Sequence, residues 1–313
     1  MDSGPSRGRA FPRPGSEVAL QLTGLSAFPI TPLTGRGDID AVGLARLVAR
    51  AVAGGAQSIG LMGSTGSYPY LPRAARIEAM RAARAAAPGV PIAVGVGAPA
   101  LLQVLNNARD AAECGMDAIL LAPVTYQPLR PAEVTGLYRA VAAEAALPVV
   151  LYNNPGTTHV TFGHDQIAEI GALPGVVSVK MPPDPDPGPA FAALRAALPA
   201  GCTLGTSGDG MAARALRAGA EVWYSVLGGL FPEPCRAMVD AAAAGNDARL
   251  DTLDARLAPV WQVFAAQGSY RAIHAAHAIM GFGEAAPPLP VLPLAGADRA
   301  AVAAALHAAE LTA

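Results

Sequence analysis

The chain contains one lysine, Lys180, at the end of the apolar run "GVVSVKMPP" (175–183), and the other 21 of its 22 lysine and arginine residues are arginine. Strand alternation would place Lys180 on the same face as Ser178, opposite Val177 and Val179. A lysine that faces the mouth of a barrel loses water, which lowers its pKa and favours the neutral amine. A neutral amine attacks carbonyl carbon and forms a Schiff base, so we interpret Lys180 as a nucleophile. A lysine that extends to solvent from a strand end is the alternative.

The segment "GSTGS" (63–67) has the residue types of a small anion site. Gly63 lets the backbone turn tightly beside a ligand, while Ser64 and Thr65 offer hydroxyl and backbone N–H donors. Such donors suit a small carboxylate. An ordinary Gly/Ser/Thr turn is the alternative interpretation.

Several tyrosine and threonine side chains follow other strand-like runs. Tyr152 stands where the strand in "LYNNPGTTH" becomes a Pro/Gly turn, and its phenol could relay a proton or be a core hydroxyl with a satisfied hydrogen bond. Thr125 and Tyr126, in "APVTYQP", could face the same site or belong to a Pro-bounded loop. Thr157 and Tyr224 are further candidates to line the site.

The remaining titratable residues indicate no metal site. Asp209, in "TSGDGM", could order the mouth of a barrel or cap the helix that follows. His274 and His277 lie three apart on a predicted helix without neighbouring carboxylates, and nothing compels a role for His159. The three cysteines are far apart, which argues against a disulfide framework or a zinc site and fits a reducing cytoplasm.

Short β-like runs alternate with Ala-rich helical stretches. Eight strands separated by seven helices predict an α/β protein with a (β/α)8 TIM barrel, whose functional residues would collect at the C-terminal ends of the strands. A doubly wound sheet is the alternative, but "GVGAPA" (95–100) lacks the third glycine of a dinucleotide fingerprint. The predicted strands are 22–31, 58–63, 91–97, 118–124, 148–154, 176–181, 202–207 and 222–228, and the predicted helices are 39–54, 72–87, 100–114, 131–146, 163–172, 188–198 and 210–218.

Beyond residue 230 the β signals stop and only helices are predicted, with a Pro-rich break at "AAPPLPVLP". The predicted helices there are 233–244, 246–266, 269–280 and 297–311. The expected organisation is a flexible Pro/Gly/Arg-rich tail (1–19), a barrel (20–232), and the last barrel helix with a C-terminal helical appendage (233–313).

The composition excludes several classes of function. With 313 residues, 52% of them hydrophobic and 15% charged, the chain can bury a sizeable core. A net charge of −2 provides no basic field for a nucleic-acid backbone. No apolar run reaches the roughly 20 residues of a membrane helix, and the first residues lack an apolar signal core. We therefore expect a cytoplasmic protein that binds small molecules.

The motifs together resemble the dihydrodipicolinate synthase / N-acetylneuraminate lyase family of class I aldolases, over roughly residues 22–230. The likeness rests on an early "TP" (Thr31, Pro32), on "GSTG" where the family has a Gly-Thr-Thr-Gly-Glu type motif, on "YNNP" where it has Tyr-Asn-x-Pro, and on a strand that ends at Lys180.

The resemblance implies that Lys180 forms a Schiff base with a 2-oxo acid, typically pyruvate, without a cofactor or metal. It also implies that Ser64 and Thr65 hold the carboxylate and that Tyr152 shuttles protons. The family further implies a homo-oligomer, a dimer or a tetramer.

The sequence departs from the best-known members at several positions. Ser67 replaces the glutamate that commonly ends the glycine motif, and Thr157 replaces the arginine that serves the carboxylate of the synthases' second substrate. Thr125 falls where the synthases have a strand-four tyrosine, with Tyr126 one residue later, and "MPPD" begins directly after Lys180. These differences argue against true dihydrodipicolinate synthase activity and leave the second substrate open.

We therefore hypothesise a Schiff-base lyase or aldolase that makes or cleaves a C–C bond of a 2-oxo acid. A dehydratase or hydratase-aldolase that uses the same imine is the nearest alternative. A non-catalytic metabolite-binding barrel is the alternative from another class of protein.

Overall fold

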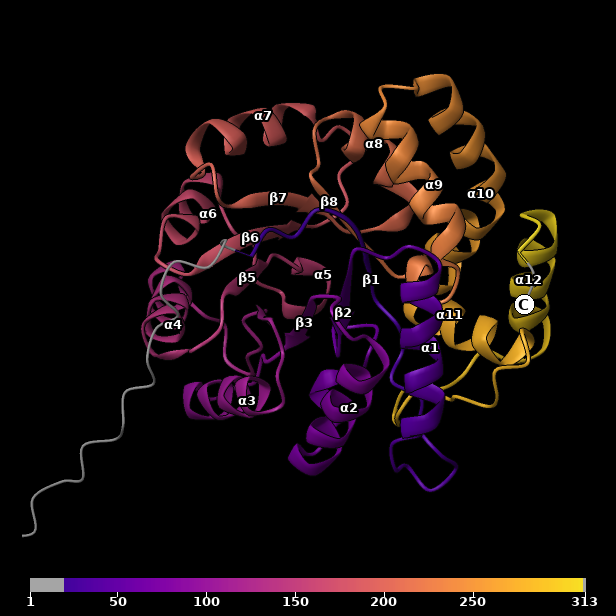
Figure 1. Ribbon diagram of the computed structural model, residues 1–313, viewed down its shortest axis with the longest axis horizontal. Helices are drawn as coiled ribbons and strands as arrows, with labels where there is room; N and C mark the ends of the chain where they lie inside the picture. The colour runs from indigo at the N-terminus through magenta and orange to yellow at the C-terminus, as the bar shows by residue number, and fades with distance from the viewer. Residues whose placement is uncertain (1–19, 312–313) are drawn as a thin grey trace, which may run out of the picture.

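The computed structural model describes residues 20–311, and its centre is a closed barrel of eight parallel strands hydrogen-bonded in the order β1 to β8 (Figure 1). The barrel closes where β1 pairs with β8, with Ser26 opposite Tyr224. Closure confirms the predicted (β/α)8 class and excludes the doubly wound sheet. The predicted tail, residues 1–19, lies outside the described residues. The strands are β1 (Gly24–Ala27), β2 (Ser58–Leu61), β3 (Ile92–Gly95), β4 (Ala118–Leu121), β5 (Val149–Tyr152), β6 (Val176–Met181), β7 (Thr203–Thr206) and β8 (Val222–Ser225).

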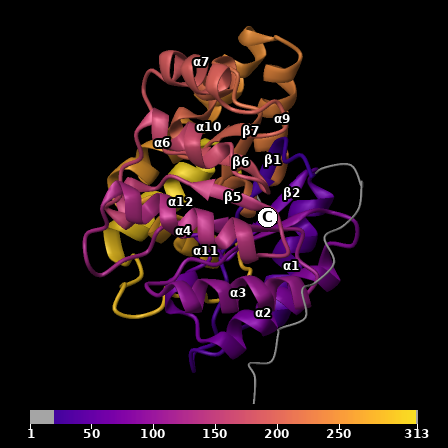
Figure 2. The same cartoon turned by 90° about the vertical axis from the view of Figure 1, so that its left-hand side faces the viewer.

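Helices surround the barrel (Figures 1 and 2). The predicted helices between residues 39 and 198 are present with ends shifted by at most two residues. A short helix after β5 was missed because "NNPGTT" has the composition of a turn, although proline also favours the first helical position. The helices are α1 (Ala41–Ala53), α2 (Arg73–Ala86), α3 (Leu101–Glu113), α4 (Pro131–Glu144), α5 (Pro155–Thr158), α6 (His164–Gly171), α7 (Gly188–Ala197), α8 (Ala212–Arg217), α9 (Pro232–Ala243), α10 (Asp247–Gln267), α11 (Ser269–Ile279) and α12 (Gly296–Ala308), with 3₁₀ turns η1 (Tyr68–Tyr70), η2 (Asp209–Met211) and η3 (Leu227–Gly229).

The strand β6 has the predicted bounds, and the other seven strands are shorter than the predicted runs because apolar residues continue beyond the last ladder pair. Phe28, Met62, Val96 and Ala122 each lie one residue past the end of a strand and are buried. They enter the loops at the C-terminal end of the barrel, where burial continues without strand pairing. Hydrophobicity alone therefore cannot locate where a strand ends.

Alternation along the strands separates the barrel interior from the layer under the helices. In β5, Tyr152 belongs to the interior cluster, whereas Leu151 belongs to the cluster between strands and helices. In β6, Val179 packs outward, as the sequence predicts. The next side chain, Lys180, therefore points into the barrel.

The C-terminal helices α10, α11 and α12 pack against one another at one side of the barrel, next to α1 and α9 (Figure 1). Residues of α10 and α11 also reach the mouth of the barrel, where Trp261 and Tyr270 line a pocket. Between residues 20 and 311, no helix combines the length and the apolar content needed to cross a membrane.

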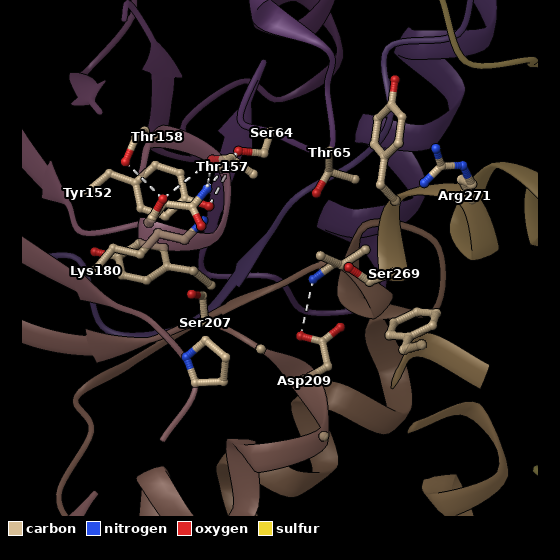
Figure 3. A pocket seen from close by; sticks show the side chains of 18 of the residues that line it. Ser64, Thr65, Tyr152, Thr157, Thr158, Lys180, Ser207, Asp209, Ser269 and Arg271 are labelled. Carbon is tan, nitrogen blue, oxygen red and sulfur yellow. Dashed lines mark hydrogen bonds between the residues drawn. The ribbon is translucent and has the colours of Figure 1, made fainter. Parts of the chain in front are cut away.

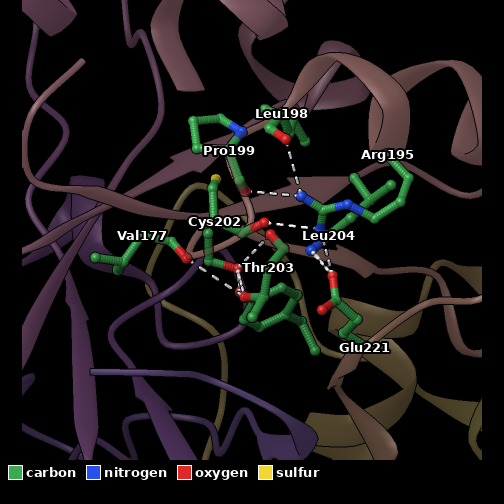
Figure 4. Close-up of polar contacts among 10 residues, drawn as sticks. Val177, Arg195, Leu198, Pro199, Cys202, Thr203, Leu204 and Glu221 are labelled. Carbon is green, nitrogen blue, oxygen red and sulfur yellow. Dashed lines mark hydrogen bonds and ion pairs between the residues drawn. The ribbon is translucent and has the colours of Figure 1, made fainter. Parts of the chain in front are cut away.

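A polar network around Arg195 joins the N-terminal ends of two strands (Figure 4). Arg195 of α7 donates to the Glu221 carboxylate at 2.8 Å and to the carbonyl oxygens of Cys202 and Pro199 at 2.9 and 2.8 Å. The same carboxylate accepts the N–H of Leu204 at 2.8 Å. These bonds tie the starts of β7 and β8 together, at the end of the barrel opposite the strand ends that carry Lys180 and Tyr152.

Gly95, the last residue of β3, determines where the loop after β2 lies. A Cβ atom at Gly95 would sit 1.9 Å from the carbonyl oxygen of Met62, which begins that loop with a φ of 48°. Backbone cannot yield as a flexible side chain can, so we expect Gly95→Ala to lower the free energy of unfolding by about 2–4 kcal/mol.

Gly136→Ala is the matched control, because Gly136 lies on the exposed face of α4 and a Cβ there meets nothing within 4 Å. It should raise the free energy of unfolding by about 0.5–1 kcal/mol. Equilibrium urea unfolding measures both variants. Equal effects in the two would show that Gly95 does not constrain the loop.

Candidate active site

Lys180 lies at the bottom of a pocket at the mouth of the barrel and is only 3% exposed (Figure 3). Its Nζ is 3.8 Å from the ring centroid of Phe28, 4.1 Å from that of Tyr152 and 5.4 Å from that of Tyr224. Loss of water in this surrounding lowers the pKa of Lys180 to about 7, although the charge of Asp209 opposes the change. A large fraction of Lys180 is therefore the neutral, nucleophilic amine at neutral pH.

Strand register fixes Tyr152 beside Lys180. The two residues are direct partners across β5 and β6, and the N–H of Asn153 donates to the carbonyl oxygen of Lys180 at 3.0 Å. On the other side, Lys180 pairs with Gly205 of β7. A Cβ at Gly205 would lie 2.3 Å from Val222 Cγ1 and 2.7 Å from the Tyr224 ring, so the glycine leaves space for both side chains.

A short hydrogen-bond chain connects Tyr152 to the loop after β2. The Tyr152 hydroxyl lies 3.5 Å from Ser64 Oγ, and that oxygen accepts from Asn154 Nδ2 at 3.2 Å. Burial raises the pKa of Tyr152 to about 12, with the Ser64 hydrogen bond acting in the opposite direction. The phenol is therefore protonated at neutral pH, and it is placed to exchange a proton with a group bound at Lys180.

The loop after β2 presents donors to the pocket. Ser64 and Thr65 both line it (Figure 3), and, within residues 20–311, neither their amide N–H groups nor Thr65 Oγ1 make a hydrogen bond that would occupy them. Gly63 lies behind them, where a Cβ would come within 2.7 Å of the Phe28 ring. Gly63 therefore serves close packing against Phe28, whereas its predicted place beside a ligand falls to Ser64 and Thr65.

Tyr224 lines the pocket with its ring, but its hydroxyl is already bonded. The oxygen lies 2.6 Å from Ser178 Oγ, and Ser178 in turn donates to the carbonyl oxygen of Thr203 at 3.1 Å. Burial raises the pKa of the Tyr224 phenol above its usual range. Tyr224 therefore contributes its ring, and not its hydroxyl, to the surroundings of Lys180.

Asp209 is buried at the end of β7 and organises the end of β8. Its carboxylate accepts from Trp223 Nε1 at 3.0 Å, from the N–H of Val226 at 3.2 Å and from the N–H of Leu227 at 2.7 Å. Burial raises the pKa of Asp209 to about 6, against the lowering effect of these donors. These contacts fit the predicted role in ordering the mouth of the barrel better than the predicted role as a cap of the following helix.

The pocket has a volume of about 910 Å³ and is much larger than pyruvate needs. Its outer part is mainly apolar, and sequence inspection missed it because half of it comes from the C-terminal appendage. Three missed residues lie directly after a strand and could have been found by the rule that strand ends build the site: Phe28 beside Lys180, and Ser207 and Val226 in the pocket lining. The outer wall includes Val124, Pro183, Met211, Trp261, Phe264 and Val291.

The other predicted site residues differ in their placement. Thr157 and Thr125 line the pocket, but Thr157 Oγ1 accepts from Asn154 Nδ2 at 2.5 Å and the Thr125 hydroxyl donates to the Gln127 carbonyl. The prediction that Tyr126 faces the site is wrong. Its side chain is 92% exposed and does not line the pocket, because the chain turns outward after Thr125 into an irregular loop.

The histidines take structural positions. His274 and His277 are buried, and their Nδ1 atoms contact the carbonyl oxygens of Ala285 at 2.5 Å and Gly283 at 3.0 Å. Burial lowers the pKa of His274 to about 4. In the part of the chain that the structure describes, no three His, Cys, Asp or Glu side chains group as metal ligands.

Fold and site together define a TIM barrel with one buried lysine at the C-terminal ends of its strands. The family model for the dihydrodipicolinate synthetase family matches residues 21–309. A 4-hydroxy-tetrahydrodipicolinate synthase from Stenotrophomonas maltophilia is 31% identical over 283 residues, which cover 90% of this chain and 94% of that protein.

Solved structures agree. A dihydrodipicolinate synthase from Agrobacterium tumefaciens has a TM-score of 0.89 and 40% identity, covering 92% of this chain and 98% of its own. A putative dihydrodipicolinate synthetase from Pseudomonas aeruginosa has a TM-score of 0.85 and 27% identity, covering 92% and 100%. The chain therefore belongs to the dihydrodipicolinate synthase family of lyases, which confirms the resemblance found in the sequence.

Burial of Lys180 also has a consequence for stability. Its pKa is about 7 in the folded chain against an ordinary value of 10.5, so between these pH values the unfolded chain binds the additional proton. The contribution of Lys180 to the free energy of unfolding therefore rises as the pH rises from about 7 to about 10.5. Lys180→Met keeps a similar length and removes the charge.

We expect Lys180→Met to exceed the wild type in free energy of unfolding by roughly 2–4 kcal/mol at pH 7, and by clearly less at pH 9.5. Urea unfolding of both proteins at the two pH values measures this. A difference that stays the same at both pH values would mean that the lysine keeps its ordinary pKa in the folded chain.

Proposed function

We propose that the protein is a lyase or aldolase that binds a 2-oxo acid such as pyruvate as a Schiff base on Lys180 and makes or breaks a C–C bond. The observation that carries the proposal is the burial of the only lysine of the chain among three aromatic rings, beside Tyr152. Membership of the dihydrodipicolinate synthase family supports it.

The chemistry follows from the neutral amine. Lys180 Nζ attacks the keto carbon and gives a carbinolamine, whose oxygen then leaves as water while the C=N bond forms. Tyr152 is placed to exchange the protons that these steps require. The imine withdraws electrons, so the adjacent methyl carbon loses a proton and the imine becomes an enamine. The enamine carbon attacks an aldehyde carbon, the aldehyde oxygen takes up a proton, and the C=N bond forms again. Water then cleaves the imine and restores the amine.

The loop after β2 would hold the carboxylate of the 2-oxo acid. Ser64 and Thr65 combine two amide N–H groups with two hydroxyls on the pocket wall near Tyr152. A carboxylate there would accept several charge-assisted hydrogen bonds, which also fix the keto carbon relative to Lys180.

The second substrate would differ from that of the synthases. Proteins named 4-hydroxy-tetrahydrodipicolinate synthase are among the relatives of this chain, but Thr157 is neutral where those synthases are expected to carry an arginine. The neutral position argues for an aldehyde other than that of the named synthases.

A dehydratase or hydratase-aldolase that uses the same imine is the second candidate. The observation that favours it is the apolar outer wall with Trp261 and Phe264, which suits a larger and less polar substrate than a short-chain aldehyde.

The proposal includes three further features of the protein. The imine itself would serve as electron sink, so no cofactor or metal is needed. Family analogy suggests a homo-oligomer, either a dimer or a tetramer. The separated cysteines fit a cytoplasmic location.

Reductive trapping tests the Schiff base. Borohydride added to the protein with pyruvate should produce a mass increase that peptide mapping localises to Lys180, and Lys180→Met should give none. The N-terminal amine is the only other amine, so the assignment is direct. Absence of an adduct with pyruvate and with a panel of other 2-oxo acids would reject the imine mechanism and favour a non-catalytic binding barrel.

Tyr152→Phe separates proton transfer from binding. The variant keeps the ring beside Lys180 and loses the hydroxyl, so the pyruvate adduct should still form, more slowly. Turnover should fall by about 10²–10⁴-fold, the usual contribution of a general acid–base group. The comparison needs rates of trapping and of turnover in the same preparation. Unchanged turnover would remove Tyr152 from the mechanism.

A further inference from the structure

We propose that Arg271 of α11 binds a carboxylate on the second substrate and thereby selects an oxo compound with an apolar body and an anionic end. The inference rests on the proposed function, in which Lys180 holds the first substrate. It names the chemical class of the second substrate and a residue that determines specificity.

Charge in the pocket is sparse. Among the lining residues that the structure describes, only Lys180, Asp209 and Arg271 can carry a full charge near neutral pH. Lys180 would be consumed as an imine, and Asp209 already accepts three hydrogen bonds from the end of β8. Arg271 is therefore the lining group that offers a permanent positive charge to a second ligand.

Arg271 has no partner that would explain its position. Some arginines are held by carboxylates, as Arg73 is by Asp110 and Arg217 is by Asp247, whereas the exposed Arg256 of α10 makes no salt bridge within residues 20–311. Within residues 20–311, Arg271 makes neither a salt bridge nor a side-chain hydrogen bond. It also lies in the first turn of α11, where a cation is unfavourable for the helix. Stability of the helix therefore does not account for it.

Neighbouring contacts fix the helix that carries Arg271. The Tyr270 hydroxyl lies 2.7 Å from Ser67 Oγ, so the start of α11 is tied to the loop that holds Ser64 and Thr65. In Figure 3, Arg271 and Ser269 border the pocket from α11, on the side of Thr65 and across from Lys180 and Tyr152. The position relative to the lysine is thus set by the fold.

One wall of the pocket between the two ends is apolar. It consists of Trp261 and Phe264 of α10 with Met211 and Val291, whereas Ser207, Gln262 and Ser269 contribute polar groups elsewhere in the lining. A ligand that fills the pocket would place its carbonyl carbon at the lysine end, an apolar body against this wall, and its carboxylate at the guanidinium, which can bind both oxygens.

Paired probes test the assignment. 4-Formylbenzoate and 4-formylbenzamide share their shape and differ in charge, and 4-oxobutanoate and 4-oxobutanamide form an aliphatic pair. Each is titrated calorimetrically into protein whose Lys180 has been capped with pyruvate and borohydride. The readout is the ratio of the amide Kd to the carboxylate Kd. The proteins are wild type, Arg271→Gln, Arg271→Lys and Arg256→Gln, the last a control on an exposed arginine of α10 outside the pocket.

We expect the wild type to favour the carboxylate of at least one pair by about 10-fold, as for one charge-assisted contact. The preference should disappear in Arg271→Gln, survive in part in Arg271→Lys and remain in Arg256→Gln. Equal Kd values in both pairs for the wild type, or a preference that persists in Arg271→Gln, would overturn the assignment.

Capping also separates the two proposals. A missing mass increase at the capping step counts against the Schiff base alone, and the same titrations on uncapped protein then still test Arg271. Capping of Arg271→Gln at the wild-type rate shows that this variant is folded and that Lys180 is intact.

Discussion

The desolvated amine of Lys180 is the interaction on which the site depends. Three aromatic rings lie within 5.4 Å of its Nζ and provide no acceptor comparable to water. Ring faces attract an ammonium by about 0.5–2 kcal/mol, which offsets only part of the lost hydration. The neutral amine is the form that a carbonyl carbon can capture, so the same burial that reduces stability near pH 7 prepares the nucleophile.

Backbone geometry at the mouth keeps this environment in place. Gly95 makes room for the Met62 carbonyl, Gly63 for the Phe28 ring and Gly205 for the Tyr224 ring. The loop after β2 contains two non-glycine residues with positive φ, Met62 at 48° and Ser67 at 60°. This backbone conformation needs support from its surroundings. The bond between Ser67 and Tyr270 supplies part of that support and links the carboxylate loop to the helix that carries Arg271.

The barrel and the inner half of the site follow from local sequence patterns. Alternation along β6 gives the direction of Lys180, and the rule that strand ends build the mouth of a barrel finds Tyr152, Ser64 and Thr65. The outer half of the site does not follow from local sequence patterns. It depends on α10 and α11, which reach the mouth of the barrel only through tertiary packing that no spacing in the sequence encodes. Tyr126 shows the converse error, since a residue close to a strand end can still turn outward with its loop.

The most direct test of the central claim is the pKa of Lys180 itself. Because the chain has one lysine, protein grown with ε-¹³C-labelled lysine gives a single side-chain NMR signal, which can be followed from pH 5 to pH 11 without assignment. A midpoint near 7 in the folded protein, which moves to about 10.5 in urea, is the expected result. A midpoint close to 10.5 in the folded protein would contradict the account, because the amine would then be protonated and poorly nucleophilic at neutral pH.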